Sequence, residues 1–449
     1  MRTTIQTQMR MVNAYIDHDH ALELQVMSGI LDAEPGIVEL VYGDLIRGGI
    51  EADNGREGMT AEQVLRALIM KQMNGFSYEE LAFHLADSSS YRAFCRYGFD
   101  EESVSKSTLQ RNIKRVRPET LEAINQLLIR RACEEGIERG RKVRIDTTVM
   151  ESNIHEPRDS ELLWDSVRVL VRLMERAKDL IEIRFTDHGR RAKRRALGIL
   201  HAKGEKERVR RYKDLLKVTR KTVSSAEGVA EALERCHLMG RMAAADRLAA
   251  QLREYIDWAD RVIFQTERRV LEGEAVPSKE KVVSIFEPHT DIIVKDRRDT
   301  HYGHKLTLSC GASGLVLDCV VEEGNPADAT LAVKMVERQE ALFGRPPRQA
   351  AFDGGFASTV NLRDIKELGV QDVAFSKRRG LKVADMVRST WVYRRLRRFR
   401  AGIEGIISFL KRCFGMERCT WRGCASFKAY AWASVVSMNL VLLARHMLA

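Results

Sequence analysis

Three acidic residues of this chain have the residue type and the surroundings of a divalent-metal site. Asp146 lies in VRIDTTVME, Asp353 in QAAFDGGF and Glu404 in RRFRAGIEGIISFLKR. The first two segments have strand patterns and the third has a helical pattern. Carboxylates from separate elements can converge on two Mg²⁺ ions, which drive in-line attack on a phosphodiester, and Mn²⁺ can substitute because oxygen ligands accept both metals. We therefore predict that Asp146, Asp353 and Glu404 are metal ligands and catalytic residues.

Basic side chains surround the third carboxylate. On a helix, Arg397, Arg400, Glu404 and Lys411 fall on one face, at steps of three, four and seven residues. This arrangement predicts that the three cations contact DNA phosphates beside the carboxylate. The alternative is an exposed helix on which Arg400 and Glu404 form an ordinary pair four residues apart.

Two glycines count against the exposed-helix alternative. Gly402 and Gly405 both lie inside the predicted helix, where each costs about 1 kcal/mol relative to alanine. We expect a close approach to the backbone to offset this cost.

The overall charge favours a polyanionic partner. The 449 residues carry a net charge of +11, so nucleic acid is the simplest partner, and 44% hydrophobic residues suffice for a full core. The eight cysteines form no CxxC pair, which favours a reduced cytoplasmic protein over a disulfide scaffold or zinc site. The most apolar segment, 429–443, is interrupted by polar residues, so we predict a buried C-terminal helix and no membrane association.

Residues 60–135 have the pattern of short helices. Three capping boxes are predicted, at Thr60 with Gln63, Ser77 with Glu80, and Ser107 with Gln110. The last predicted helix begins near Ser107 and carries three cations that would contact DNA: Arg111, Lys114 and Arg115. A helix-turn-helix DNA-binding domain and a plain helical dimerisation domain both fit this pattern.

The order of the remaining elements predicts a mixed α/β core. The Asp146 strand is followed by a long helical stretch with runs of Arg and Lys and two apolar heptad seams, one from Leu163 to Ile181 and one from Leu248 to Thr266. Strands then alternate with helices, one of which is predicted to start at Pro326, up to the Glu404 helix. We predict an RNase H-like mixed-sheet catalytic core with a large α-helical insertion. The predicted domains are an N-terminal helical DNA-binding domain (1–138), the core (139–154 and 281–449) and the insertion (155–280).

These motifs resemble those of a DDE transposase of a bacterial insertion sequence. DTTVMESNI resembles the first-Asp segment, AFDGGF the second, and Arg400, Glu404 and Lys411 keep the spacing of the signature Y-x2-R-x3-E-x6-K, with Arg397 in place of its tyrosine. SIFEPHTDIIVKDRR followed by YGHK resembles the long-insert subgroup (ISNCY-like). The resemblance implies Mg²⁺-dependent cleavage at terminal inverted repeats, attack of the freed 3′-OH on target double-stranded DNA, and a homodimer or larger synaptic complex on DNA associated with the nucleoid.

Two other functions and several other residues compete with this interpretation. A stand-alone DDE-type nuclease would cut without strand transfer, and a non-catalytic sequence-specific repressor would lack one carboxylate. HYGH and the histidine of SIFEPHTD could flank a metal, although a structural role is favoured. Other acids lack a comparable strand or glycine context. These candidates are His289, His301, His304, Asp159, Asp187, Asp291 and Asp299.

Overall fold

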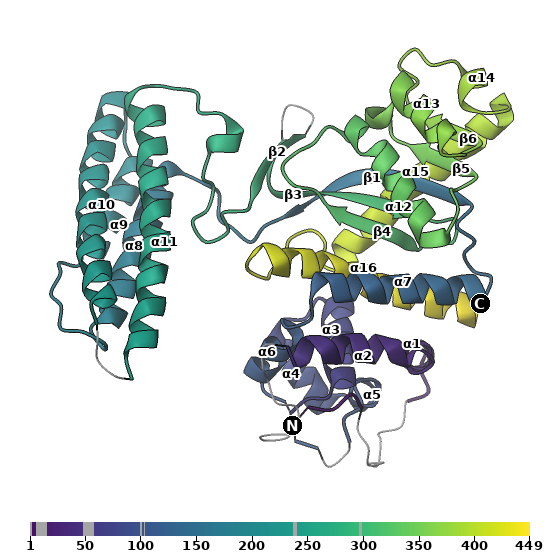
Figure 1. Cartoon of the computed structure of the whole chain (residues 1–449), viewed down its shortest axis with the longest axis horizontal. Helices are drawn as coiled ribbons and strands as arrows, with labels where there is room; N and C mark the ends of the chain where they lie inside the picture. The colour runs from purple at the N-terminus through teal and green to yellow at the C-terminus, as the bar shows by residue number, and fades with distance from the viewer. Residues whose placement is uncertain are drawn as a thin grey trace. The chain divides into compact units, whose positions relative to one another are not determined.

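The chain, seen in a computed structural model, forms two units (Figure 1). The structure describes residues 2–5, 16–47, 58–98, 101–102, 104–236, 240–295 and 299–449. One unit comprises Met1–Ser152 and Gly303–Ala449, and the other is Asn153–Tyr302.

The first unit begins with helices whose ends carry polar caps. The capping boxes predicted at Thr60 and Ser77 are confirmed at the starts of α3 and α4. The box predicted at Ser107 is wrong, because the Ser105 hydroxyl accepts from the Thr108 amide and α6 begins two residues earlier than Ser107 would allow. The helices are α1 (Asp19–Asp32), α2 (Pro35–Leu45), α3 (Ala61–Asn74), α4 (Tyr78–Asp87), α5 (Ser89–Phe94), α6 (Lys106–Ile113) and α7 (Pro118–Glu134).

A six-stranded mixed sheet follows in the order β2-β3-β1-β5-β6, with β4 also paired to β3. Strand β1 is antiparallel to β3 and parallel to β5, and β5 is parallel to β6. The strand ends of β1, β5 and β6 therefore meet at one edge. The strands are β1 (Lys142–Glu151), β2 (Asp291–Lys295), β3 (Asp299–Cys310), β4 (Val316–Val321), β5 (Gln349–Phe352) and β6 (Asp372–Phe375).

Helices connect and cover these strands. The helix expected to start at Pro326 begins later, as a 3₁₀ turn at Asp328–Thr330 and then α12. A second 3₁₀ turn, Gly354–Phe356, follows β5 directly. Helix α15 contacts β1, β5 and β6, which makes it the cover of the edge where the predicted carboxylates lie. The helices are α12 (Ala332–Phe343), α13 (Thr359–Glu367), α14 (Val383–Met386), α15 (Thr390–Cys413) and α16 (Cys424–Leu448).

Helix α16 joins the N-terminal helices to the sheet. It is long and apolar enough to cross a membrane, but 89% of its most apolar window is buried inside the protein, as a core helix would be. It packs against α1, α3, α7 and β4, and Figure 1 shows it alongside α7. Its buried Asn439 is fully used: Nδ2 donates to Asn125 and to the Val316 carbonyl, and Oδ1 accepts from the Val316 amide. The N-terminal helices and the sheet therefore share one hydrophobic core.

The second unit is a helical bundle with its own core. Helices α8, α10 and α11 pack against one another, and α9 packs against α8 and α10. Most residues of the two predicted seams are buried, and Ile181 and Tyr255 are half-buried. The buried ones are Leu163, Val167, Leu170, Met174, Ala177, Leu248, Leu252, Ala259, Val262 and Thr266. The elements are α8 (Asp159–Ala177), α9 (Gly189–Leu200), α10 (Glu205–Glu234) and α11 (Met242–Thr266), then a π-helical turn (Glu267–Leu271) and a 3₁₀ turn (Ser278–Glu280).

The chain leaves and re-enters the sheet at paired positions. Glu151 of β1 faces Gly303 of β3, so the whole second unit is inserted between two neighbouring strand residues. A Cβ on Gly303 would collide with the Met150 carbonyl oxygen, which explains the glycine at the point of re-entry.

Candidate active site

Strand β1 directs three alternate side chains toward α15. Because successive strand residues face opposite sides, Lys142, Arg144 and Asp146 share one face. The cations of Lys142 and Arg144 lie 4.1 and 4.6 Å from the centre of the Phe399 ring on α15. Arg144 Nη1 also donates to the Phe399 carbonyl at 2.9 Å. These contacts dock the helix on the strand and bring Asp146 beneath the residue that follows Phe399.

Asp353 is held beside Asp146 by strand register. Ile145 of β1 pairs with Phe352 of β5 in a parallel ladder. Asp146 directly follows Ile145, and Asp353 directly follows Phe352. The Ser376 hydroxyl, just after β6, donates to Asp353 at 2.7 Å. The two glycines after Asp353 are crowded: a Cβ on Gly354 would lie 2.7 Å from Cβ of Lys377, and one on Gly355 would lie 2.6 Å from Asp328 Oδ2.

The guanidinium of Arg400 contacts all three predicted catalytic carboxylates. Its Nη2 lies 2.7 Å from Asp146 and 3.3 Å from Asp353, and its Nη1 lies 2.7 Å from Glu404. The Arg400 side chain is only 15% exposed, whereas Glu404 is 66% exposed. The structure therefore brings Asp146, Asp353 and Glu404 around one cation, and the pair of Arg400 with Glu404 is not an isolated surface pair.

The two aspartates differ in acidity because their surroundings differ. Burial raises the pKa of Asp146, and this effect exceeds the opposing influences of Arg400 and of the Thr147 amide. Burial also pushes the pKa of Asp353 upward, but hydrogen bonds from Ser376 and the Gly354 amide, together with Arg400, outweigh it and lower the pKa. Asp353 is thus the more acidic of the two aspartates.

The three carboxylates are suitable ligands for a divalent metal, and the Arg400 guanidinium lies where they converge. Two aspartates that contact the same guanidinium nitrogen converge on one point, and carboxylate oxygens are the ligands that Mg²⁺ prefers. Among the described residues, however, no group of three or more Asp, Glu, His or Cys side chains is close enough to hold an ion together. A metal would need the guanidinium to move aside.

A fourth carboxylate, which sequence reasoning missed, lies next to this cluster. Asp328 accepts from Thr147 at 3.3 Å and pairs with Lys305 at 3.1 Å. Its charge contributes to raising the pKa of Asp146, after burial and beside Asp353. Asp328 begins a short 3₁₀ turn after Pro326, and the pattern there predicted only a helix start. The sequence feature that bears on Asp328 is Lys305 of the YGHK motif, which is its ion-pair partner.

The other predicted DNA-contacting residues of α15 lie outside the cluster. Arg397 is exposed and lies over the Tyr393 ring, 5.9 Å from its centre. Lys411 lies 3.7 Å from Glu417. Tyr393, one turn before the expected tyrosine position, is buried and donates to the Phe375 carbonyl of β6 at 2.9 Å. This tyrosine therefore anchors α15 to the sheet.

The N-terminal cations divide into exposed and structural groups. Arg111 on α6 is exposed, whereas Lys114 and Arg115 are half-buried. Arg115 donates to the Leu45 carbonyl at the end of α2, at 3.1 Å. Burial, reinforced by the charges of Arg115 and Arg111, lowers the pKa of Arg2, which marks a local concentration of positive charge. The helix-turn-helix assignment is not confirmed.

The alternative metal candidates have structural partners. His289 lies 2.8 Å from Glu287, and the ring of His304 packs edge-on against Phe427. Asp159 binds Arg269 at 2.8 Å, and Asp187 accepts from the Gly189 amide at the start of α9. All four of the other acids, Asp159, Asp187, Asp291 and Asp299, belong to the second unit.

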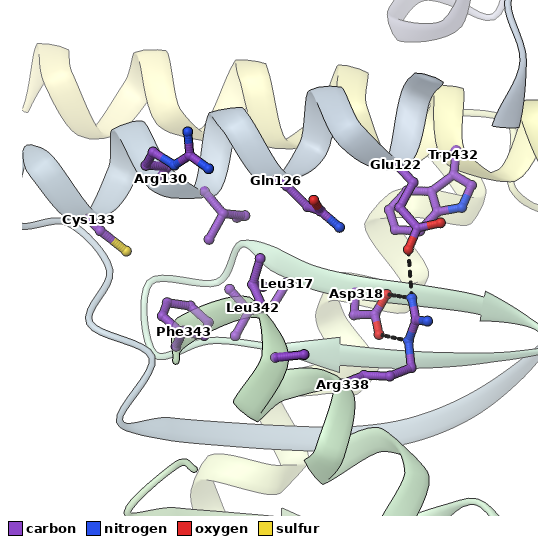
Figure 2. A pocket seen from close by; sticks show the side chains of 12 residues that line it. Glu122, Gln126, Arg130, Cys133, Leu317, Asp318, Arg338, Leu342, Phe343 and Trp432 are labelled. Carbon is purple, nitrogen blue, oxygen red and sulfur yellow. Dashed lines mark hydrogen bonds and ion pairs between the residues drawn. The ribbon is translucent and has the colours of Figure 1, made fainter. Parts of the chain in front are cut away.

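A separate cavity of about 450 Å³ lies between α7, β4 and α12. Figure 2 shows Arg338 directed at Asp318 and Glu122 on its wall, and these contacts measure 2.5 and 2.7 Å. None of the predicted site residues lines this cavity, so the carboxylate cluster remains the candidate active site.

Acidic residues on β1, after β5 and on α15, around a mixed sheet, are the layout expected of the DDE class of nucleic-acid enzymes. Comparison with known families agrees: a transposase domain model (DUF772) matches residues 10–115, and a transposase DDE domain model matches residues 287–440. Two transposase family models thus match separate parts of this chain, which is consistent with a DDE transposase of an insertion sequence.

The matched regions and the fold support each other. The DDE domain implies an RNase H-like fold, and the six-stranded mixed sheet with its helices is consistent with that α/β class. The DDE match contains Asp353 and Glu404, whereas Asp146 lies outside both matches. A curated protein from Rhizobium meliloti, "Uncharacterized protein ORF8 in nfe locus", is 27% identical over 175 residues, covering 37% of this chain and 84% of its own length. No solved structure matches the chain.

Proposed function

We propose that this transposase cleaves DNA at the ends of an insertion sequence and joins the freed 3′-OH to target DNA. The observation that carries the proposal is the convergence of Asp146, Asp353 and Glu404 on Arg400. Such a cluster on a protein of +11 net charge suits an active site for a phosphodiester substrate.

Asp146, Asp353 and Glu404 would hold two divalent ions, which when bound supply an activated water and stabilise charge on the attacking and leaving oxygens. Asp353 is suited to provide a permanent negative charge, because Ser376 and the Gly354 amide keep its pKa low. Arg400 leaves the carboxylates and binds the phosphate of the DNA end, for which its planar fork is suited. Arg397 and Lys411, on the same helix, contact flanking phosphates.

The reaction has two balanced steps. Water attacks the terminal phosphodiester, the bond to the 3′ oxygen breaks, and that oxygen takes up a proton to become a 3′-OH. The 3′-OH then loses its proton and attacks a target phosphodiester, the target's own P–O3′ bond breaks, and the displaced 3′ oxygen takes up a proton to become a new 3′-OH on the target strand. A dimer or larger complex of the protein processes both ends of the element, and each end, with its terminal inverted repeat, is brought to the target DNA.

Conservative variants of the three carboxylates test this proposal. Asp146→Asn, Asp353→Asn and Glu404→Gln should each abolish Mg²⁺- or Mn²⁺-dependent nicking of terminal DNA and leave DNA binding in EDTA largely intact. Asp372→Asn is a suitable control, because this buried aspartate binds Arg388 outside the cluster. A carboxylate variant that nicks at the wild-type rate removes that residue from the site. Nicking without joining of the 3′-OH to target would favour a stand-alone nuclease.

A further inference from the structure

Positive charge in the helical bundle of the second unit is concentrated on α9 and the first half of α10. Helix α9 contains five basic and no acidic residues. On α10, the basic residues all precede Ser224, and the remainder of the helix carries three glutamates instead, Glu227, Glu231 and Glu234. A solvent-exposed helix surface commonly mixes charges of both signs, whereas here the basic and acidic residues are largely separated.

The cations of α9 fall into two groups according to their contacts. Those on its flanks hold the helix in the bundle: Arg191 and Arg195 pair with Asp214 of α10, and Lys193 lies over the Trp164 ring of α8. The buried face consists of Ala192, Ala196 and Ile199.

Arg190 and Arg194 lie on the opposite, outward face of α9. Both are exposed, and within the described part of the chain neither forms an ion pair with a carboxylate. These two arginines do not take part in holding the bundle together.

Helix α10 carries a longer row of the same kind. Steps of three and four residues place five exposed cations on the side opposite the buried residues: Lys206, Arg210, Lys213, Lys217 and Lys221. None of the five forms an ion pair within the described residues, whereas the neighbouring Arg211 and Arg220 bind Glu207 and Glu267. At a rise of about 1.5 Å per residue the row is roughly 22 Å long. Asp214 borders the row and ties α9 beside it.

We propose that this surface, the α9–α10 basic face, binds the phosphate backbone of double-stranded DNA. Charge complementarity identifies the partner, because a straight row of unpaired cations matches the regular phosphates of a duplex, which carries one charge per ~1.7 Å of axis. Single strands are less suited, because their binding sites add exposed aromatic rings on which bases stack. Tyr212, the aromatic residue of α10, is buried.

The surface would give the transposase a DNA contact separate from both the carboxylate cluster and the N-terminal helices. This surface would not recognise a particular base sequence, because contacts to the phosphate backbone carry no direct sequence information. It would therefore hold end and target duplexes with equal strength.

Neutral double variants of the full-length chain test this inference. Lys213→Gln with Lys217→Gln, and Arg190→Gln with Arg194→Gln, each remove two cations while keeping good helix formers. The matched control is Arg247→Gln with Arg261→Gln, two exposed arginines on α11, a helix outside the α9–α10 basic face. Binding to a random duplex and to an insertion-end duplex is measured in EDTA, so cleavage plays no part.

We expect each α9–α10 variant to weaken binding to both duplexes by about tenfold per lost contact at 0.1 M salt, and the slope of log K against log salt to fall by about 0.9 per contact. The α11 control should keep the wild-type slope, and all melting temperatures should agree. Unchanged slopes in both test variants, or an equal loss in the control, would overturn the proposal. Preferential binding of a single strand over a duplex at this face would also overturn it.

Discussion

Arg400 and Asp146 are 254 residues apart in the sequence and form a 2.7 Å hydrogen bond at the centre of the candidate active site. The same guanidinium also contacts Asp353 and Glu404. A single positive charge thus compensates three negative ones, and Arg400 Nε is buried without a hydrogen-bond partner among the described residues. The arginine is therefore held by its charge contacts and not by a complete hydrogen-bond network.

Removal of Arg400 should destabilise the protein more than the loss of a surface pair would. An exposed pair four residues apart contributes about 0.3–0.5 kcal/mol, but leaving the buried Asp146 unpaired should cost about 1–3 kcal/mol in EDTA. In Arg400→Ala, added Mg²⁺ should then raise the melting temperature more than in the wild type, because the metal replaces the lost charge. Arg400→Lys should restore DNA-end binding only in part. Equal Mg²⁺ effects on the wild type and Arg400→Ala would contradict this role.

The two glycines of α15 should respond differently to alanine. A Cβ on Gly405 meets open space, so Gly405→Ala should raise the free energy of unfolding by up to about 1 kcal/mol. A Cβ on Gly402 would collide with Arg144 Nη1, which donates to the Phe399 carbonyl. Gly402→Ala should therefore be less stable than Gly405→Ala by about 1 kcal/mol or more. Chemical denaturation of the two variants measures the difference, and equal stabilities would show that Arg144 adjusts freely.

Lys71 should make stability depend on pH. Burial lowers the pKa of this lysine to about 8 in the folded chain, below its usual value of 10.5. Between these two pH values the folded state releases a proton that the unfolded state keeps, so the free energy of unfolding should rise with pH. Lys71→Met should stabilise the protein at pH 7, by an amount on the order of 3 kcal/mol, and the gain should shrink toward pH 10.

The exposed Lys106, paired with Glu79, offers the control for this effect. Lys106→Met should change stability little at either pH. If Lys71→Met raised the free energy of unfolding by the same amount at every pH, burial of the charged ammonium would not be the cause of the lost stability.

The N-terminal cations should separate DNA binding from stability. Arg111→Gln should weaken duplex binding and lower the salt slope by about 0.9, with an unchanged melting temperature, because Arg111 is exposed. Arg115→Gln should also lower the melting temperature, because Arg115 donates to the Leu45 carbonyl. These variants must be made in the full chain, since α16 completes the core around α3 and α7. If Arg111→Gln binds normally at low salt, the helical region is a packing domain.

Local patterns predicted the elements of the site well. The strand of Asp146, the glycine turn after Asp353 and the helix of Glu404 are each encoded in fewer than about 20 residues, and short-range sterics and periodicity suffice to recognise them. The caps at Thr60 and Ser77 are equally local. The pattern at Ser107 was ambiguous, because Ser105, two residues earlier, offers the same capping hydroxyl.

Relationships between distant segments could not be predicted in the same way. The position of Arg400 among the carboxylates depends on how Phe399 packs on Arg144, and no sequence period encodes that contact. Asp328 enters the cluster only because Thr147 and Lys305 meet it across neighbouring strands. The shared core of the N-terminal helices and the sheet likewise depends on a C-terminal helix that is more than 300 residues away from α3.

The pairing of Glu151 with Gly303 makes the helical bundle a removable module. Because its entry and exit are neighbours in one ladder, an in-frame deletion closed by a tight turn would leave the β1–β3 register intact. Loop-closure entropy changes only slowly with length, so inserts of very different size could be exchanged at this point at small cost. The junction between β1 and β3 is thus a point where related genes could gain, exchange or lose an accessory domain while the catalytic sheet keeps its strand pairing.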